Sequence, residues 1–180
     1  MKENKKQKLK KLNFYIVDEE YINYLSNYDK HIAYNKKEKR PYIGVLINVK
    51  EHLYFAPLFS PKLKHKLYKN NLSYFQIYNI SSKQNLGIIR FTDMIPIPKD
   101  CVHLLNMKNL TYHYKRLLIE QYNCINLTDN LKKIYNKSTK LYNIIIGNKK
   151  SKEYNFYNKL CCNYKLLEEK SIEYVETIKV

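Results

Sequence analysis

Apolar and polar residues first alternate in short runs that are typical of strands. Residues 14–17 are β-branched or aromatic and predict a strand, and the segment that starts at Asp18 predicts a helix with an acidic first turn. Residues 42–49 and 53–58 predict two further strands, which a tight loop at residues 50–52 joins as a hairpin. We expect this hairpin to form the centre of a sheet.

A second pair of strands is predicted at residues 73–80 and 86–91. Pro96 and Pro98 are expected to end this extended run, because proline has no N–H for a strand ladder. A further short strand is expected at residues 101–105.

From residue 109 onward the apolar period changes to that of helices. The first apolar stripe consists of Tyr114, Leu117, Leu118, Tyr122 and Ile125. The second consists of Leu131, Ile134, Tyr135, Leu141, Tyr142 and Ile145. We expect Thr111 and Thr128 to be the N-caps of these two helices, and Gly147 to end the second one.

A third helix is expected over residues 152–174, with Phe156, Leu160, Tyr164 and Leu167 facing the core. Because strands come first and helices later, the pattern predicts an α+β protein and not an alternating α/β fold. We expect a twisted, largely antiparallel sheet or a partly closed barrel, with packed helices mostly in the C-terminal half.

The length of 180 residues suits one domain, and no Gly/Pro/Ser-rich linker divides the chain, so a single domain is expected over residues 13–180. Residues 1–12 carry clustered lysines and are expected to form a basic, disordered tail. The tail lacks the apolar segment of a secretory signal, and no later stretch is apolar enough to cross a bilayer. These features favour a cytoplasmic protein without a membrane partner.

Charge and cysteine content narrow the class of partner. The formal net charge of +17 favours polyanions such as nucleic acid. Cys101, Cys124, Cys161 and Cys162 show neither a CxxC pair nor metal-ligand spacing with histidine. We therefore expect buried free thiols, and no metal site or cofactor.

Residues 54–66 join an apolar strand to a loop of hydroxyl and cationic groups. Pro57 and Pro61 restrict the backbone around Ser60. The basic residues that follow are Lys62, Lys64, His65 and Lys66. This combination suits a phosphate-handling site on rigid support, although the stretch alone also fits a strand followed by a solvated basic loop.

Four blocks of sequence have a characteristic order and spacing. They are Tyr42-Ile-Gly-Val-Leu with Tyr54-Phe-Ala-Pro-Leu-Phe-Ser-Pro-Lys, Leu86-Gly-Ile-Ile running to Met94-Ile-Pro-Ile, Tyr114-Lys-Arg-Leu-Leu, and Cys162-Asn-Tyr-Lys-Leu-Leu-Glu-Glu-Lys. In these blocks the chain resembles the ToxN/AbiQ family, the endoribonuclease toxins of RNA-antitoxin (type III) toxin-antitoxin and phage abortive-infection systems. The resemblance extends over residues 14–174.

Two positions depart from the family pattern. Members often carry Thr before the motif serine, whereas this chain has Phe59, so one hydroxyl group is missing. The basic residue before the Ile-Gly strand is Arg40, where some members have Lys, and the two side chains differ in geometry and acidity. The aromatic residue upstream is matched to Tyr34.

The resemblance implies metal-independent cleavage of RNA, in which the 2′-OH attacks the adjacent phosphorus and leaves 2′,3′-cyclic phosphate and 5′-OH ends. On this hypothesis Ser60 orients the phosphate and the 2′-OH, Lys62 stabilises the phosphorane, and Arg40 donates to the same oxygens. Tyr34 is expected to share proton transfer, and His65 is a candidate acid or base because its ordinary pKa lies near neutrality.

The resemblance also implies that the toxin cuts and is inhibited by a repeat-derived, pseudoknotted antitoxin RNA, and that cellular and phage mRNAs are its substrates. Such RNA units could bridge several toxin subunits into a protein–RNA hetero-oligomer. The residues expected to bind RNA are Lys36, Lys39, Phe59, Lys64, Lys66, Lys115, Arg116, Lys132 and Lys133.

Two other functions fit parts of the same sequence. A non-catalytic RNA-binding module would use the same basic surface without turnover. A basic peripheral membrane protein would be anchored by residues 2–11, which is a weak attachment without a lipid. The remaining histidines are expected to be structural or solvated, namely His31, His52, His103 and His113.

Overall fold

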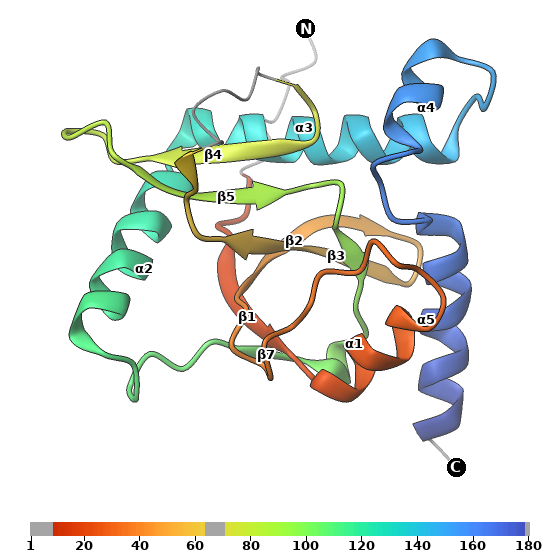
Figure 1. Cartoon of the computed structure of the whole chain (residues 1–180), viewed down its shortest axis with the longest axis horizontal. Helices are drawn as coiled ribbons and strands as arrows, with labels where there is room; N and C mark the ends of the chain where they lie inside the picture. The colour runs from red at the N-terminus through yellow and green to blue at the C-terminus, as the bar shows by residue number, and fades with distance from the viewer. Residues whose placement is uncertain (1–8, 64–70, 179–180) are drawn as a thin grey trace, which may run out of the picture.

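The computed structural model describes residues 9–63 and 71–178. These residues form one open antiparallel sheet with the strand order β4-β5-β3-β2-β1-β7, and β6 pairs with β3 beside this path (Figure 1). The strands are β1 (Asn13–Val17), β2 (Tyr42–Val49), β3 (His52–Phe59), β4 (Tyr74–Tyr78), β5 (Asn85–Arg90), β6 (Ile95–Pro96) and β7 (Val102–Leu104). The predicted α+β class and the central β2–β3 hairpin are confirmed, and the sheet is open, not a partly closed barrel.

The helices lie mostly in the C-terminal half, as expected. They are α1 (Glu19–Ser26), a short 3₁₀ helix (Lys99–Cys101), α2 (Tyr112–Ile125), α3 (Thr128–Ile146), α4 (Lys152–Tyr157) and α5 (Tyr164–Ile178). In Figure 1, α2 and α5 stand at opposite ends of the sheet, and α3 runs along the side of β4. Two caps were predicted correctly, Thr111 and Gly147, whereas α3 has Leu127 as its N-cap and Thr128 as its first residue.

The prediction of a single helix over residues 152–174 was wrong, because the chain breaks between α4 and α5. In the break, the backbone N–H of Cys162 donates to the carbonyl oxygen of Thr92 at 2.9 Å, and that of Asn163 donates to Asp29 Oδ2 at 2.6 Å. These tertiary bonds replace the helical ones. As a result Phe156 and Leu160 are exposed, although Tyr164 and Leu167 are buried as expected, and Tyr157 is buried in α4.

Strand β5 ends at Arg90, before the two prolines, whereas the short strand β6 ends at Pro96 as expected and Pro98 precedes the 3₁₀ helix. Pro96 lies in β6 opposite Tyr54, and its carbonyl oxygen accepts a bond of 2.7 Å from the Tyr21 hydroxyl. A two-residue strand that pairs on one side accommodates proline, because such a strand needs few backbone N–H donors and proline has none.

Strand β3 is the centre of the core, because β2, β5 and β6 all pair with it. Tyr54, Phe55 and Ala56 are almost completely buried. On β2, a Cβ atom at Gly44 would overlap the Phe55 ring, so only glycine leaves room for this ring beside the neighbouring strand.

A group of tyrosines joins β3 to α3 and α5. The hydroxyls of Tyr54 and Tyr142 both donate to Glu168 Oε1, each at 2.8 Å, and the Tyr164 hydroxyl donates to the carbonyl oxygen of Phe91 at 2.8 Å. The Tyr54 ring lies 5.2 Å from Tyr142 and 5.6 Å from Tyr164, both edge to face. We call these four residues, Tyr54, Tyr142, Tyr164 and Glu168, the tyrosine cluster. Tyr142, which belongs to the second predicted apolar stripe, and Tyr164, which was expected to face the core, are both buried here.

The segment before β1 packs against the α2–α3 connection. Leu12 is fully buried, and its backbone N–H and carbonyl groups bond to the side chain of Asn126 at 2.8 and 3.0 Å. Residues 1–8 of the predicted tail lie outside the described residues. Within residues 9–63 and 71–178, no helix is long and apolar enough to cross a membrane.

Candidate functional site at the end of strand β3

The predicted phosphate-handling loop begins where β3 leaves the sheet. Phe59 is the last residue of the strand and is half-buried, whereas Ser60 and Lys62 are exposed just after it. The rigid support expected for Ser60 is therefore present, because β3 is paired on both sides near its end. Lys64, His65 and Lys66 lie outside the described residues.

Arg40 lies just before β2 in the sequence and packs against the end of β3. Its Nε donates to the carbonyl oxygen of Tyr34 at 2.6 Å, and its Nη1 donates to that of Leu58 at 3.3 Å. Its guanidinium lies 4.1 Å from the centroid of the Phe59 ring, within cation–π range. Arg40 is only 7% exposed, and its bonds to the Tyr34 and Leu58 carbonyl oxygens hold this part of the backbone together.

The connection between Tyr34 and Arg40 is a left-handed turn. Lys36, Lys37 and Glu38 have φ angles of 59°, 54° and 59°, which cost roughly 1–2 kcal/mol each in residues other than glycine. The turn is held at its ends, because the buried Asn35 side chain donates to the carbonyl oxygen of Val17 at 2.8 Å. Glu38 and Glu19, at the start of α1, each accept a bond from the other's backbone N–H.

This turn exposes the predicted RNA-binding residues Lys36 and Lys39, together with Lys37. The side chain of Tyr34 is 66% exposed beside them. The structure therefore brings Tyr34, Lys36, Lys39, Arg40 and Ser60 to the same end of β3.

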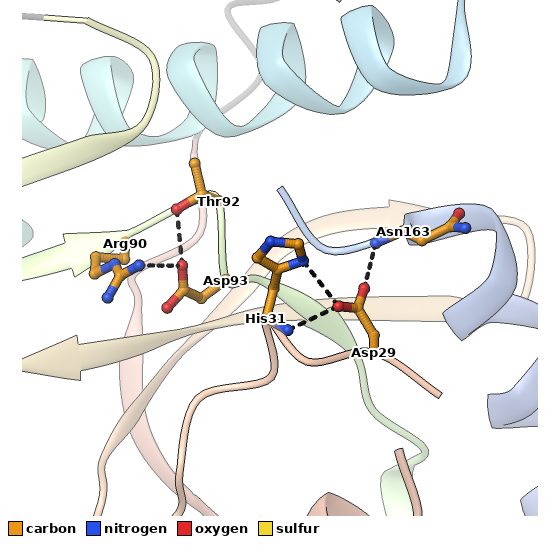
Figure 2. A network of polar contacts seen from close by, with 6 residues as sticks. All are labelled: Asp29, His31, Arg90, Thr92, Asp93 and Asn163. Carbon is orange, nitrogen blue, oxygen red and sulfur yellow. Dashed lines mark hydrogen bonds and ion pairs between the residues drawn. The ribbon is translucent and has the colours of Figure 1, made fainter. Parts of the chain in front are cut away.

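Arg90, at the end of β5, completes the group of charges around Phe59. Its guanidinium lies 4.8 Å from the centroid of the same ring that contacts Arg40. Its Nη2 lies 2.9 Å from Asp93 Oδ1, which also accepts a bond of 2.7 Å from the Thr92 hydroxyl (Figure 2). We call Arg40, Phe59, Arg90 and Asp93 the arginine cluster.

A second carboxylate network continues from the arginine cluster toward α5. Figure 2 shows Asp93 lying between Arg90 and His31. Asp29 Oδ1 accepts a bond of 2.8 Å from the backbone N–H of His31 and lies 3.0 Å from its Nδ1, while Oδ2 accepts from the backbone of Asn163. His31 is thus a partly buried, structurally bonded residue, and it borders a pocket of about 1140 Å³ that also contains Glu168.

Burial and charge act against each other inside the arginine cluster. Burial lowers the pKa of the Arg40 guanidinium, and the positive charge of Arg90 lowers it further, against the opposing effects of Tyr42 and Asp93. Burial raises the pKa of the Asp93 carboxyl even though Arg90, the Thr92 hydroxyl and Arg40 act in the other direction. The Tyr42 hydroxyl is buried beside these groups without a hydrogen-bond partner among the described residues, and burial raises its pKa as well. The cluster therefore places the buried Arg40 and the buried Asp93 carboxyl beside the partly exposed Arg90.

The predicted RNA-binding residues of the helices lie on other parts of the surface. Lys115 and Arg116 are exposed on α2, which packs against β4 and β5, and Arg116 Nε lies 3.2 Å from Glu120 Oε1. Lys132 and Lys133 are exposed at the start of α3. Within the described parts of the chain, no hydrogen bond or ion pair joins these four residues to the end of β3.

The described residues contain neither a metal-ligand cluster nor a disulfide. Among the described residues, no group of three or more His, Cys, Asp or Glu side chains could hold a metal ion. Cys101, Cys124, Cys161 and Cys162 are all buried free thiols, as the sequence predicted.

Sequence reasoning missed Arg90 and Asp93. A signal was present, because an arginine at the end of an apolar strand is followed three residues later by an aspartate. Their importance, however, depends on the register in which Phe59 lies opposite Ile88, and a single sequence does not reveal this register.

Known proteins resemble this chain in both sequence and fold. Residues 13–171 match the family model for toxin ToxN of type III toxin-antitoxin systems. The chain is 33% identical to the endoribonuclease ToxN of Pectobacterium atrosepticum, over 88% of this chain and 91% of that protein. It is 31% identical to the endoribonuclease ToxN of Bacillus thuringiensis subsp. kurstaki, over 91% of this chain and 84% of that protein. A solved structure described for selective toxin inhibition by a non-coding RNA pseudoknot superposes with a TM-score of 0.83 at 29% identity, covering 93% of this chain and 99% of that one.

Proposed function

We propose that this chain, which belongs to the ToxN family of type III toxin-antitoxin systems, is an endoribonuclease toxin whose active site lies at the end of β3. Its relatives carry the name endoribonuclease. The observation that carries the location is the excess of positive charge around Phe59, directly before the exposed Ser60. An RNA phosphate is the anion that such a place would attract.

The proposed reaction is an attack of the ribose 2′-OH on the adjacent phosphorus, which breaks the bond to the 5′ oxygen and leaves 2′,3′-cyclic phosphate and 5′-OH ends. Ser60 orients the phosphate and the 2′-OH, and Lys62 stabilises the negative charge of the phosphorane. The buried Arg40 adds a fixed positive charge to the same place. Tyr34 and His65 are the candidates for proton transfer. Cationic and hydroxyl groups suffice for this chemistry, so we propose that it needs no metal ion.

We further propose that the toxin acts in the cytoplasm on cellular and phage mRNA, and that it cuts its own repeat-derived, pseudoknotted antitoxin RNA and is inhibited by it. The structural relative described with an RNA pseudoknot supports this partner. Lys36 and Lys39 on the left-handed turn, with Phe59, would bind RNA near the active site. The contact would be extended by Lys115, Arg116, Lys132 and Lys133 on α2 and α3, and by Lys64 and Lys66, which lie outside the described residues. RNA units that touch several of these surfaces would link toxin subunits into a hetero-oligomer.

Cleavage assays with the purified chain test the active site. Ser60→Ala is expected to lower the single-turnover rate of RNA cleavage by about 100- to 1000-fold, and Lys62→Ala by a similar factor, since each removes a transition-state contact. Ser81→Ala, in the exposed β4–β5 turn, and Lys99→Ala, near the start of β3, are the matched controls. Wild-type rates in Ser60→Ala and Lys62→Ala would overturn the assignment.

The chemistry has its own test. A substrate with a single 2′-deoxyribose at the cut site is expected to stay intact, the products of normal RNA are expected to accept a 5′ phosphate from a kinase without prior phosphatase treatment, and EDTA is expected to leave the rate unchanged. A requirement for magnesium would contradict the proposed mechanism. If the protein binds RNA tightly but never cleaves it in single-turnover conditions, the non-catalytic RNA-binding module is the better description.

A further inference from the structure

Two arginines contact the Phe59 ring at the end of β3, but they differ in burial and in their hydrogen-bond partners. Arg40 is 7% exposed, and its Nε and Nη1 donate to the carbonyl oxygens of Tyr34 and Leu58. The side chain of Arg90 is 45% exposed, and its ion-pair partner among the described residues is Asp93 through Nη2. Two N–H groups of the buried Arg40 thus bond to the protein's own backbone, whereas the partly exposed Arg90 contacts one carboxylate oxygen through Nη2 and presents its other N–H donors toward solvent.

Strand register fixes where Arg90 points. Phe59 lies opposite Ile88 in the β3–β5 pair, and Arg90, two residues further on, faces the same side of the sheet as Ile88. Arg90 is therefore the diagonal neighbour of Phe59, close enough for the guanidinium to reach the ring at 4.8 Å. The Phe59 ring gives the Arg90 guanidinium a flat surface to lie on.

Asp93 holds the other side of the Arg90 guanidinium. The carboxylate is 4% exposed, and the Thr92 hydroxyl donates to the same oxygen that contacts Arg90, so its position is fixed. The Phe59 ring and the Asp93 carboxylate together limit the rotation of Arg90. A guanidinium held in this way presents a fork of donors to solvent at low entropic cost, which is the geometry that suits a phosphate group.

The balance of charge in the arginine cluster favours an anion as its ligand. Arg40 and Arg90 carry two positive charges, and Asp93 supplies one negative charge between them. The geometry points to Arg90 as a phosphate-binding residue of the RNA site, held in place by Asp93 and Phe59, which binds a phosphodiester of the RNA backbone beside Ser60. This role rests on the proposed function, because it takes RNA as the ligand.

Binding measurements at several salt concentrations test the inference without requiring cleavage. The probe is a short single-stranded RNA in which every ribose is 2′-O-methylated, so that the 2′-OH cannot attack. Arg90→Ala is expected to weaken binding about 10- to 100-fold at low salt, and to reduce the slope of log affinity against log salt by about 0.7, the share of one phosphate on a single strand. Lys99→Ala is the matched one-charge control, because Lys99 lies in a pocket with His52, at the start of β3 and about 23 Å of strand from Phe59.

Two more variants separate charge from geometry. Arg90→Lys keeps the charge but not the fork, so the salt slope is expected to stay that of the wild type while single-turnover cleavage falls about tenfold. Asp93→Asn keeps Arg90 but loosens it, so the salt slope is expected not to decrease while cleavage falls. A merely structural role of Asp93 would instead leave the cleavage rate of the folded variant unchanged.

The outcomes distinguish this inference from the proposed function. If Arg90→Ala matches Lys99→Ala in affinity and slope while the wild type cleaves RNA, the role of Arg90 is overturned and the proposed function stands. If the wild type cleaves no RNA but Arg90→Ala still reduces the salt slope, the phosphate site stands and the proposed enzyme fails. If Arg90→Ala does not fold, Arg90→Lys becomes the deciding variant. Cleavage by Arg90→Lys at the same rate as the wild type would contradict a forked contact with phosphate.

Discussion

Strand β3 carries two polar groups of opposite character, the tyrosine cluster around Tyr54 and the arginine cluster around Phe59, about 17 Å apart along the strand. In the tyrosine cluster each hydroxyl has an acceptor, Glu168 or the carbonyl oxygen of Phe91. In the arginine cluster two cations share one carboxylate, and Arg90 is partly exposed. The first arrangement is complete within the protein and stabilises the fold, whereas the second is completed only by an added anion.

Alkaline pH should affect the tyrosine cluster most strongly. Burial raises the pKa of Tyr54, Tyr142 and Tyr164, so the folded state keeps these protons while the unfolded chain loses them above its ordinary pKa of 10.0. Their contribution to stability is complete below pH 10 and is lost as pH rises toward the folded values. At pH 11 the ionisation of these three tyrosines in the unfolded chain is expected to lower the free energy of unfolding by about 4 kcal/mol in total. Denaturant unfolding at pH 8 to 11 measures this loss, and a flat profile would contradict it.

Replacing Arg40 should damage both folding and activity. Arg40→Ala removes the donors to the carbonyl oxygens of Tyr34 and Leu58 and is expected to lower the free energy of unfolding by about 3 kcal/mol. Urea unfolding measures the stability, and RNA cleavage is expected to fall with it. Arg40→Lys is the control, because it restores the charge but not the forked bonds, and it should recover only part of the loss. Full stability in Arg40→Ala would show that the guanidinium does not hold this backbone.

A single hydroxyl deletion should separate the two clusters. Tyr54→Phe removes one of the two donors to Glu168 and is expected to destabilise the fold by about 1 kcal/mol at neutral pH, with the RNA cleavage rate unchanged. Above pH 10 the free energy of unfolding of the wild type should fall more steeply than that of Tyr54→Phe, by about 1.4 kcal/mol per pH unit. Tyr142→Phe, which deletes the other donor, is the matched comparison. A large loss of cleavage in folded Tyr54→Phe would mean that the clusters are coupled.

The smallest effect is expected from Asp93 at acid pH. Its folded pKa is raised above the ordinary 3.8, so the folded state binds this proton more tightly than the unfolded chain does. The contribution of Asp93 to stability therefore falls as pH rises from about 4 through its folded pKa. Asp93→Asn does not titrate, so its stability relative to the wild type should rise over that window in urea unfolding curves. A relative stability that is constant or falls would contradict the raised pKa.

Local pattern was enough to predict most elements, because their burial follows from their own sequence. The apolar run of β2 and the helical stripe of α2 appear in the structure close to their predicted limits. The break between α4 and α5 was missed because its causes are distant partners, Thr92 and Asp29, which bond to the backbone of residues 162 and 163. Tertiary contacts here override a helical period that continues through the break.

The site was predicted in part for the same reason. Ser60 and Lys62 were found because strand, prolines and cations adjoin one another in the sequence. Arg90 and Asp93 belong to another strand and become neighbours of Phe59 only through the β3–β5 register. The burial of Arg40, which makes it a backbone anchor, also depends on a fold that its exposed, lysine-rich surroundings in the sequence do not indicate.

The contact between Gly44 and the Phe55 ring restricts how this sequence can diverge. Any side chain at position 44 would displace an aromatic ring in the middle of the sheet, and overpacking of this kind costs about 1–3 kcal/mol. A smaller residue at position 55 would remove the clash but leave a cavity unless position 44 grew at the same time. The two sites can therefore change only as a pair, so we expect homologous sequences to show glycine with an aromatic partner, or a larger residue facing a smaller one.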